Sequence, residues 1–368
     1  MRMILIILLI VAGLAYLSQQ QSIRYNNKKN DIFLISLLIF LVLLAGLRVS
    51  YNDTGNYIRV FNNAPTFINF INDPENLDIM NNPLFYGFQS LVKTFTSNYT
   101  TFFIICAVIV NINFVKFIKK HSETDDFYIS MFLYVCLGTL MLSMAAQKQI
   151  LTMSILTIAL DALFDKKYVK YYIIVFLAGL IHTYAWLFLF LPILGSKPWN
   201  TKTYLMLFVT MFIMNYFQDA IESFVEIADS VGKNIATEEV FDGNQMNVLR
   251  VAVYAVVPIS AFIFQGRLYK VMDRKHGIMI QMCTVSLMFM LMGTLNGANM
   301  FGRSANYFEI GLIMVLPWIV KNLFNKQSSK IILAAAMVCF LGFYIYDCRE
   351  FSYSYYYKTI IQYITEII

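Results

Sequence analysis

The sequence predicts an all-α protein that crosses a membrane many times, and three observations support this prediction. Hydrophobic residues make up 59% of the 368 residues and charged residues only 14%, whereas soluble proteins average about 25% charged residues. Apolar runs long enough to span about 30 Å of hydrocarbon recur along the chain. Aromatic residues, which include the Tyr and Trp that favour the headgroup region, make up 16%. We expect one integral-membrane domain, residues 1–368, with about 10–12 transmembrane or re-entrant helices.

The predicted spans follow one another with short connections. They cover residues 2–18, 32–48, 98–118, 127–144, 147–163, 203–219, 248–265, 277–295, 304–321 and 330–347. The first run resembles a signal peptide, but it lacks a small-residue cleavage site and a second span follows it, so we expect a retained anchor. Residues 168–194 are long for one helix and short for two. Gly179 and His182 interrupt this run, which indicates a bent or re-entrant pair of helices.

The basic residues predict the orientation of the spans. Most of the 28 Lys and Arg residues lie near residues 24–29, 116–120, 166–170, 197–202, 267–275 and 321–330. Short loops rich in Lys and Arg stay in the cytoplasm, so these loops are expected on that side. They alternate correctly only if residues 168–194 enter and leave on one side, which favours the re-entrant pair. The net charge of +6 is therefore mostly a signal of topology, and no nucleic-acid partner is expected.

Three segments are predicted to lie on the outer face. Residues 49–97 contain a run, 81–95, whose apolar residues share one helical face, as in a helix that lies in the membrane interface. Residues 220–247 form an acidic loop. Residues 348–368 form an amphipathic tail that is rich in Tyr.

Common cofactor and metal sites are not predicted. The five Cys residues form no CxxC pair and the three His residues are scattered, so no metal site is expected. The chain has neither a lysine-containing phosphate loop nor a dinucleotide glycine fingerprint. ATP-driven transport and nicotinamide chemistry therefore lack their usual motifs.

Three cations lie at the outer ends of predicted spans, against the general charge bias. Arg48 ends the second span, Lys148 lies in a turn between two spans, and Arg303 follows a Gly-rich hairpin. Each alone is also explained by a snorkelling side chain or a solvated turn. An ionisable group at membrane depth is costly unless it has a partner or a task. Together the three cations suit a negative group presented from the outer leaflet, such as the pyrophosphate of a lipid carrier.

Other polar residues lie near these cations in the sequence. Asp53 and Tyr57 are four residues apart, so they share a face if a helix begins after Asp53. Tyr307 likewise follows Arg303 by four residues. His182 lies in an apolar run, where it is either a hydrogen-bonded core residue or a base.

The Gly-rich stretch before Arg303 is expected to break a helix on the outer side. It contains Gly293, Gly297 and Gly302, and Glu309 lies nearly two turns into the span that follows. The alternative is a Gly-rich hairpin with an interfacial Arg.

On these motifs the sequence resembles the EpsG family, the Wzy-like polymerases of bacterial exopolysaccharide, capsule and O-antigen synthesis. The motifs are GLRxxxxDTxNY at residues 46–57, HxxA beginning at His182, RxxxYF beginning at Arg303, and the turn that contains Lys148 and Gln149. Relatives often have Arg-Gln in this turn. Lys keeps the charge but loses the planar fork of Arg.

The resemblance implies a glycosyltransferase of the GT-C type in the bacterial cytoplasmic (inner) membrane, with its active site facing outward. Such an enzyme transfers a growing glycan from undecaprenyl pyrophosphate to the non-reducing end of an incoming lipid-linked repeat unit. No cofactor and no metal is expected, because cationic side chains can stabilise the leaving pyrophosphate. A chain-length regulator and a flippase of the same pathway are candidate partners.

The sequence positions fit this scheme as follows. Arg48 and Arg303 are interpreted as clamps for the pyrophosphate, with Lys148 and Gln149 as further contacts. His182 is the first candidate for the general base.

The remaining positions have supporting or rival roles. Asp53 is the rival general base, and Tyr57 and Tyr307 position the sugar or support the Arg side chains. A flippase or transporter and a membrane O-acyltransferase of the same pathway remain alternatives. The lack of paired halves and the gathering of polar groups toward one face favour the polymerase.

Overall fold

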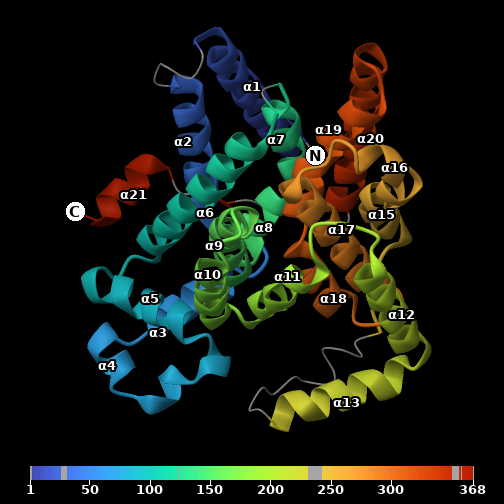
Figure 1. The fold of residues 1–368 in the computed structure, drawn as a ribbon. Helices are drawn as coiled ribbons and strands as arrows, with labels where there is room; N and C mark the ends of the chain where they lie inside the picture. Colours follow the sequence, from blue (N-terminus) through green and yellow to red (C-terminus); the bar gives the residue numbers. More distant parts are fainter. Residues whose placement is uncertain are drawn as a thin grey trace. The chain divides into compact units, whose positions relative to one another are not determined.

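The computed structural model describes residues 2–25, 31–123, 125–230, 243–349, 356–357 and 359–367. Most of these residues are helical, which confirms the predicted all-α class (Figure 1). Among them, a short antiparallel pair of strands is the exception, with β1 (Arg48–Ser50) paired to β2 (Tyr356–Tyr357). The chain forms two compact units: unit 1 contains residues 1–185 and 332–368, and unit 2 contains residues 186–331.

The helices of unit 1 surround one long central helix, α6. They are α1 (Arg2–Tyr25), α2 (Ile32–Gly46), α3 (Thr54–Asn63), α4 (Phe67–Ile71), η1 (Pro74–Leu77), η2 (Ile79–Asn81), α5 (Pro83–Phe95), α6 (Tyr99–His121), α7 (Phe127–Cys136), α8 (Thr139–Ala145), α9 (Gln147–Phe164), α10 (Tyr168–Ile181) and α21 (Ile360–Ile367). α2 and α9 pack against α6. Gly46 lets α2 approach closely, because a Cβ at this position would lie 2.7 Å from Ile104 Cγ1.

The helices of unit 2 pack around α17. η3 (Thr183–Phe190) leads into this unit, followed by α11 (Leu191–Leu194), α12 (Thr201–Asn215), α13 (Phe217–Ser230), α15 (Val248–Ile263), α16 (Gln265–Leu268), α17 (Arg274–Met292), α18 (Ala298–Asn306) and α19 (Ile310–Leu323). α20 (Lys326–Arg349) begins in unit 2 and continues into unit 1. α12, α15, α18 and α19 all contact α17.

In the part of the chain that is described, four helices are long and apolar enough to cross a membrane alone: α1, α6, α17 and α20. α7 and α8 form a further candidate that is bent by 49°. Shorter apolar helices of 10–17 residues accompany them, namely α2, α10, α15, α19 and the segment Thr183–Leu194. The protein is therefore a multi-pass membrane protein, and several expected crossings correspond to helices shorter than a full span.

Two predicted spans are each divided into two helices. The span 127–144 is divided at Gly138, whose φ of +91° is a left-handed conformation that Gly adopts readily. The span 304–321 is divided where α18 ends at Asn306 and α19 begins at Ile310. Hydropathy does not register the break at Gly138, because the residues around it remain apolar.

The Gly-rich hairpin is partly as expected. α17 ends before Gly293, and Gly297, with a φ of +66°, precedes α18. Gly302 lies inside α18, so the prediction that it breaks a helix is wrong.

The interruption of residues 168–194 is confirmed at one of its two predicted positions. α10 ends before His182, whose φ and ψ of −153° and 119° are extended. Gly179 lies inside α10 and is buried.

The segments predicted to lie on the outer face contain more helix than expected. α5 matches the helix predicted over residues 81–95 and exposes Leu84, Leu91 and Phe95, with Phe95 82% exposed. The segment 220–247, predicted to be a loop, begins inside α13, and residues 231–242 lie outside the described part. Ile221 and Val225 share one face of α13 and pack in a cluster with Met292 and Phe301.

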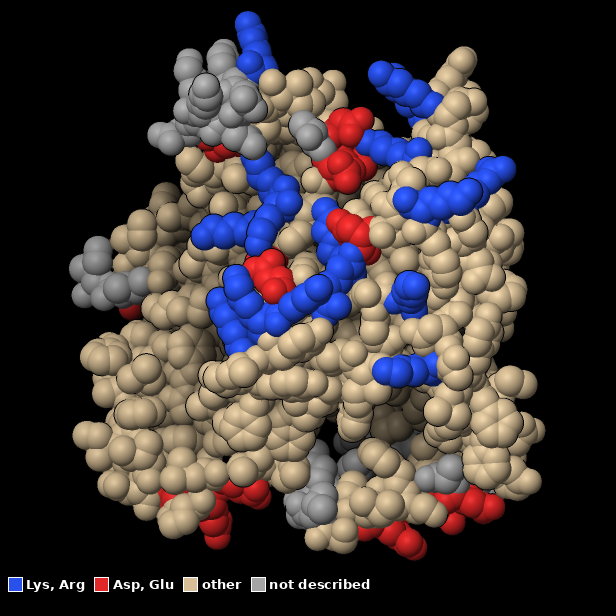
Figure 2. All heavy atoms as spheres, in the orientation of Figure 1, with Lys and Arg blue, Asp and Glu red and all other residues tan. Residues whose placement is uncertain are grey.

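The end of α6 nearest to α7 carries a network of charges. Lys119 contacts Asp31, the N-cap residue of α2, and Ser18 Oγ donates to the same carboxylate at 2.6 Å. His121 Nε2 lies 2.5 Å from Asp161 Oδ1. Figure 2 shows Lys and Arg side chains gathered with a few acidic ones over this part of unit 1, whereas acidic side chains lie at the edge below α4.

Candidate functional site

Arg48 is buried at the junction of four helices in unit 1. Its side chain is 1% exposed, and the guanidinium carbon lies 4.3 Å from the centroid of the Phe103 ring. All three guanidinium nitrogens donate hydrogen bonds: Nε to Thr54 Oγ1 at 3.3 Å, Nη1 to the Ala45 carbonyl, and Nη2 to Gln147 Oε1. Arg48 therefore fixes the end of α2 to α3, α6 and the first residue of α9.

Lys148 follows Gln147 in the first turn of α9 and is half-buried. Its Nζ donates to Tyr86 Oη at 3.1 Å and lies 5.0 Å from the centroid of the Tyr86 ring. The N-cap residue of α9, Ala146, has no side-chain acceptor for the first turn. The backbone N–H groups of a first helical turn have no acceptor within the helix, and the dipole is positive there. The Lys148 ammonium and the start of α9 therefore favour an anion at the same place.

Tyr57 connects α3 to this position. α3 begins at Thr54, as the spacing of Asp53 and Tyr57 predicted. The Lys148 backbone N–H points to Tyr57 Oη at 3.4 Å, and the Tyr57 ring packs edge-on against Phe85 at 6.3 Å. The Asp53 side chain is partly exposed and does not cap α3.

His182 lies in the break after α10 and is partly exposed. Its ring stacks on that of Tyr184, with centroids 5.2 Å apart. The backbone N–H of Thr183 donates to Asn82 Oδ1 at 3.3 Å. Asn82 precedes α5, the helix that also carries Tyr86, so the break after α10 lies against the start of α5.

The structure thus joins the predicted residues Lys148 and Tyr57 through a direct contact, and Gln147 and Tyr86 link further residues to this group. Arg48 contacts Gln147, and Lys148 contacts both Tyr57 and Tyr86. Gln149, one residue further along α9, is 2% exposed. The neighbour of His182, Thr183, connects this position to Asn82, the residue before α5.

Sequence reasoning missed three residues of this group: Gln147, Tyr86 and Asn82. Gln147 was available as the neighbour of Lys148 in the turn between spans. Tyr86 lay in a helix that the sequence predicted, but its contact with Lys148 joins positions 62 residues apart. No local pattern indicates such a contact.

Unit 2 holds the other predicted residues, on and after α18. Arg303 is exposed, whereas Tyr307 is 2% exposed and packs edge-on against Phe188 at 6.5 Å. Glu309 is 2% exposed and accepts a hydrogen bond from Tyr254 Oη at 2.8 Å. Arg303 and Tyr307 therefore differ in environment despite their spacing of four residues.

The hairpin before Arg303 is held by a segment that precedes α15. The Met246 backbone N–H donates to the Gly293 carbonyl at 2.7 Å. A Cβ at Gly293 would lie 3.3 Å from both Met246 Cε and Phe301 Cβ. A small residue is thus needed where α17 ends, and the packing there sets the start of α18.

The C-terminal tail lies beside Arg48 in unit 1. β2 pairs with β1, with Tyr357 opposite Arg48. α21 is attached to the start of α6, because Tyr363 Oη lies 3.1 Å from Thr101 Oγ1 and Asn98 Nδ2 donates to Glu366 at 3.1 Å. The described part of the predicted amphipathic tail therefore pairs with the segment that carries Arg48 and contacts the start of α6.

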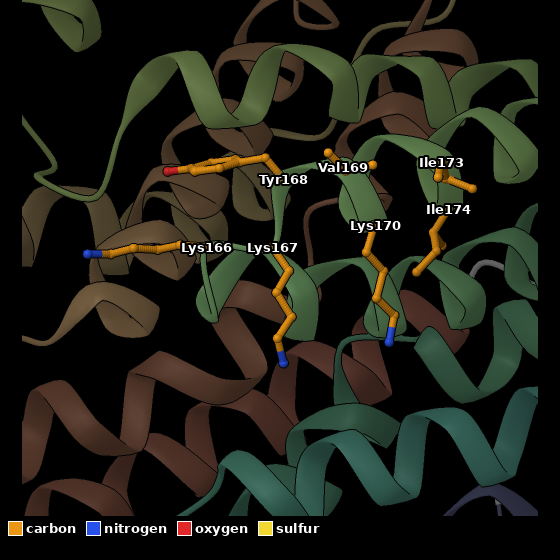
Figure 3. A pocket seen from close by; sticks show the side chains of 7 residues that line it. All are labelled: Lys166, Lys167, Tyr168, Val169, Lys170, Ile173 and Ile174. Carbon is orange, nitrogen blue, oxygen red and sulfur yellow. The ribbon is translucent and has the colours of Figure 1, made fainter.

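A hollow of about 640 Å³ opens at the start of α10, apart from the predicted residues. Figure 3 shows its lining side chains, Lys166, Lys167, Tyr168, Val169, Lys170, Ile173 and Ile174. Lys167 pairs with Asp165 at 2.8 Å. Exposed Lys side chains beside apolar ones are typical of a helix end in the headgroup region.

The apolar helices and the polar groups at their ends define a multi-pass membrane protein with a candidate anion-binding position in unit 1. The EpsG family model matches residues 31–365, and the chain belongs to the EpsG family. Membership indicates a glycosyltransferase-like polymerase with a role in polysaccharide biosynthesis. No curated protein and no solved structure matches the chain.

Proposed function

We propose that the protein is a GT-C-type polysaccharide polymerase on the outer face of the bacterial cytoplasmic membrane. It transfers a growing glycan from undecaprenyl pyrophosphate to the non-reducing end of an incoming lipid-linked repeat unit. The acceptor hydroxyl oxygen attacks the anomeric carbon of the donor sugar. The bond from that carbon to the pyrophosphate oxygen breaks, and its electron pair leaves with the pyrophosphate.

The observation that carries this proposal is the environment of Lys148. A partly exposed Lys side chain at the positive end of a helix is suited to a phosphate. The Tyr57 and Tyr86 hydroxyls beside it supply further hydrogen-bonding groups. Charge develops on the pyrophosphate as it leaves, and fixed positive groups aimed at it lower the barrier.

The other predicted residues have separate roles in this proposal. Arg48 acts as a positioning residue, because its three nitrogens already hold the start of α9 through Gln147. Arg303, on α18 of unit 2, contacts a phosphate of the substrate. His182 accepts the proton of the acceptor hydroxyl, with Asp53 as the alternative base.

The remaining predicted residues position the substrate. Tyr57 and Tyr307 hold the sugar or the neighbouring cations, and Gln149 supports the first turn of α9. These roles require the substrate to approach from the outer leaflet.

The test is polymerisation of purified lipid-linked repeat unit by the reconstituted protein, followed as a ladder of products. We expect Lys148→Met to lower the rate about 100-fold, the effect of removing one preorganised charge-stabilising group. Lys148→Arg, which restores the Arg-Gln of relatives, should keep most of the activity. Lys170→Met, which removes an exposed cation elsewhere in unit 1, is the matched control.

The same assay separates the alternatives. A flippase would move the lipid-linked repeat across vesicles without lengthening it, and an O-acyltransferase would modify it at constant length. Either result from active protein would refute the polymerase. Full polymerisation by Lys148→Met would instead remove Lys148 from the site.

A further inference from the structure

One face of α5 carries a stripe of polar residues. Asn82 precedes the helix, and Tyr86, Gln89 and Lys93 follow at spacings of four, three and four residues. Such spacings place side chains above one another on one helical face. The stripe begins beside the break that contains His182 and passes the Lys148 ammonium.

Three members of the stripe have partners on other elements. Asn82 accepts from the Thr183 backbone, and Tyr86 accepts from Lys148. Lys93 Nζ donates to a carbonyl at the end of α3 at 3.2 Å. The stripe therefore joins three elements of unit 1 to α5.

Gln89 is different. Its side chain is 1% exposed, yet neither its amide nitrogen nor its amide oxygen has a hydrogen-bond partner among the residues that the structure describes. Buried polar groups are almost always hydrogen-bonded, because an unpaired one destabilises the folded state. A leucine would fill the same space without this penalty. The unpaired amide thus points to a ligand that pairs with it.

We infer that Gln89 is a specificity-determining residue that hydrogen-bonds the sugar attached directly to the pyrophosphate. This inference rests on the proposed function. An amide offers a donor and an acceptor without charge, which suits a hydroxyl or an acetamido group better than a phosphate. Gln89 lies about one helical turn, roughly 5 Å, from Tyr86, whose hydroxyl contacts the Lys148 ammonium. A substrate phosphate bound at Lys148 would place the first sugar ring at about this distance from it, beside Gln89.

The stripe also offers a way to expose the amide. Tyr86 and Lys93 flank Gln89 on the same face, and both are partly exposed. When Lys148 exchanges its bond to Tyr86 for a substrate phosphate, the Tyr86 side chain is released to turn away. Phosphate binding and sugar recognition are then linked through one hydrogen bond.

The test compares Gln89→Leu with Ser90→Ala in purified, reconstituted protein. Ser90 is also 1% exposed, and its hydroxyl has no partner among the described residues, but it lies about 100° around the helix from Gln89. We expect Gln89→Leu to leave the Tm of the substrate-free protein unchanged or higher. It should raise the KM for lipid-linked repeat at least 10-fold, whereas Ser90→Ala should leave KM unchanged.

Two results would overturn the inference. A Tm several degrees lower in Gln89→Leu would show that the amide supports the fold. An unchanged KM would show that the amide does not contact the substrate.

A second measurement separates this inference from the proposed function. If wild-type protein makes no polymer, the proposed function fails, and binding of the lipid-free repeat-unit oligosaccharide decides the role of Gln89. A rise in Tm on adding this oligosaccharide to wild-type protein but not to Gln89→Leu would support saccharide recognition. No rise in either protein would refute it.

Discussion

Arg48 and Arg303 have the same side chain and the same predicted role, but the structure places them in opposite environments. Arg48 is 1% exposed and donates from all three guanidinium nitrogens to groups in unit 1. Arg303 is exposed on α18 in unit 2. A buried cation with fixed partners contributes to the fold, whereas replacement of an exposed side chain usually changes stability little.

A cation at the end of a predicted span can therefore serve two different functions. Arg48 donates to the Ala45 carbonyl, which the end of α2 leaves without a helical N–H donor, and also to Gln147, so its charge organises helix ends. Lys148, the residue after Gln147, keeps a partly exposed side chain. Arg48 anchors the start of α9 through Gln147, and Lys148 presents the positive charge.

Replacement of Arg48 by Ala is expected to have the largest effect. The change leaves Gln147 Oε1 and the Ala45 carbonyl without their donor and opens a cavity beside Phe103. Each unpaired buried group costs about 1–3 kcal/mol, so we expect a loss of about 3 kcal/mol in the free energy of unfolding. Activity should fall as well, because the start of α9 loses its anchor. Thermal unfolding and the polymerisation assay measure the two effects.

Arg59 provides the control for this change. It is exposed on α3 and donates to nearby Asn56 Oδ1 at 2.9 Å, so Arg59→Ala should leave both stability and activity unchanged. Equal stability of Arg48→Ala and wild type would contradict the anchoring role.

Replacement of Arg303 by Ala should separate activity from stability. The polymerisation rate is expected to fall about 100-fold, as when one charge-stabilising donor is removed. The free energy of unfolding should change by less than about 0.5 kcal/mol, because the side chain is exposed. Arg267→Ala removes another exposed cation of unit 2 and should have neither effect. A large loss of stability in Arg303→Ala would show that Arg303, like Arg48, supports the fold.

The sequence was sufficient for the elements whose signal is local. The start of α3, the helix α5 and the break at His182 follow from spacing and from single interrupting residues. The break at Gly138 could not be predicted from the sequence, because a left-handed backbone conformation in an apolar run does not change the hydropathy.

The site was predictable only in part, for a similar reason. Cations at span ends stand out against an apolar background, so Lys148 was found. The acceptor of its hydrogen bond, Tyr86, is one of 24 Tyr residues in the chain, and only the packing of α5 selects it. The unpaired amide of Gln89 is likewise a property of the folded state alone.

Lys119 is intermediate in exposure between Arg48 and Arg303. A change to its ion pair with Asp31 is expected to have the smallest effect of the three. Its side chain is 23% exposed and pairs with Asp31, which is 14% exposed. Burial opposes ionisation of Asp31, but hydrogen bonds from Lys119, Ser18 and the Leu34 backbone outweigh it and hold the pKa of this carboxyl below its usual value of 3.8. A depressed pKa contributes stability above the unfolded value that is lost as the pH falls through the folded value.

Asp31→Asn isolates this contribution, because Asn also caps helices well. At pH 7 we expect the variant to be less stable by at most about 1 kcal/mol, the range of partly exposed ion pairs. The difference from wild type should shrink below about pH 4 as Asp31 takes up a proton. Melting curves at pH 7, 5 and 3 measure it. A difference that persists unchanged at pH 3 would show that the hydrogen-bond geometry of Asp31, and not its charge, holds α2 to α6.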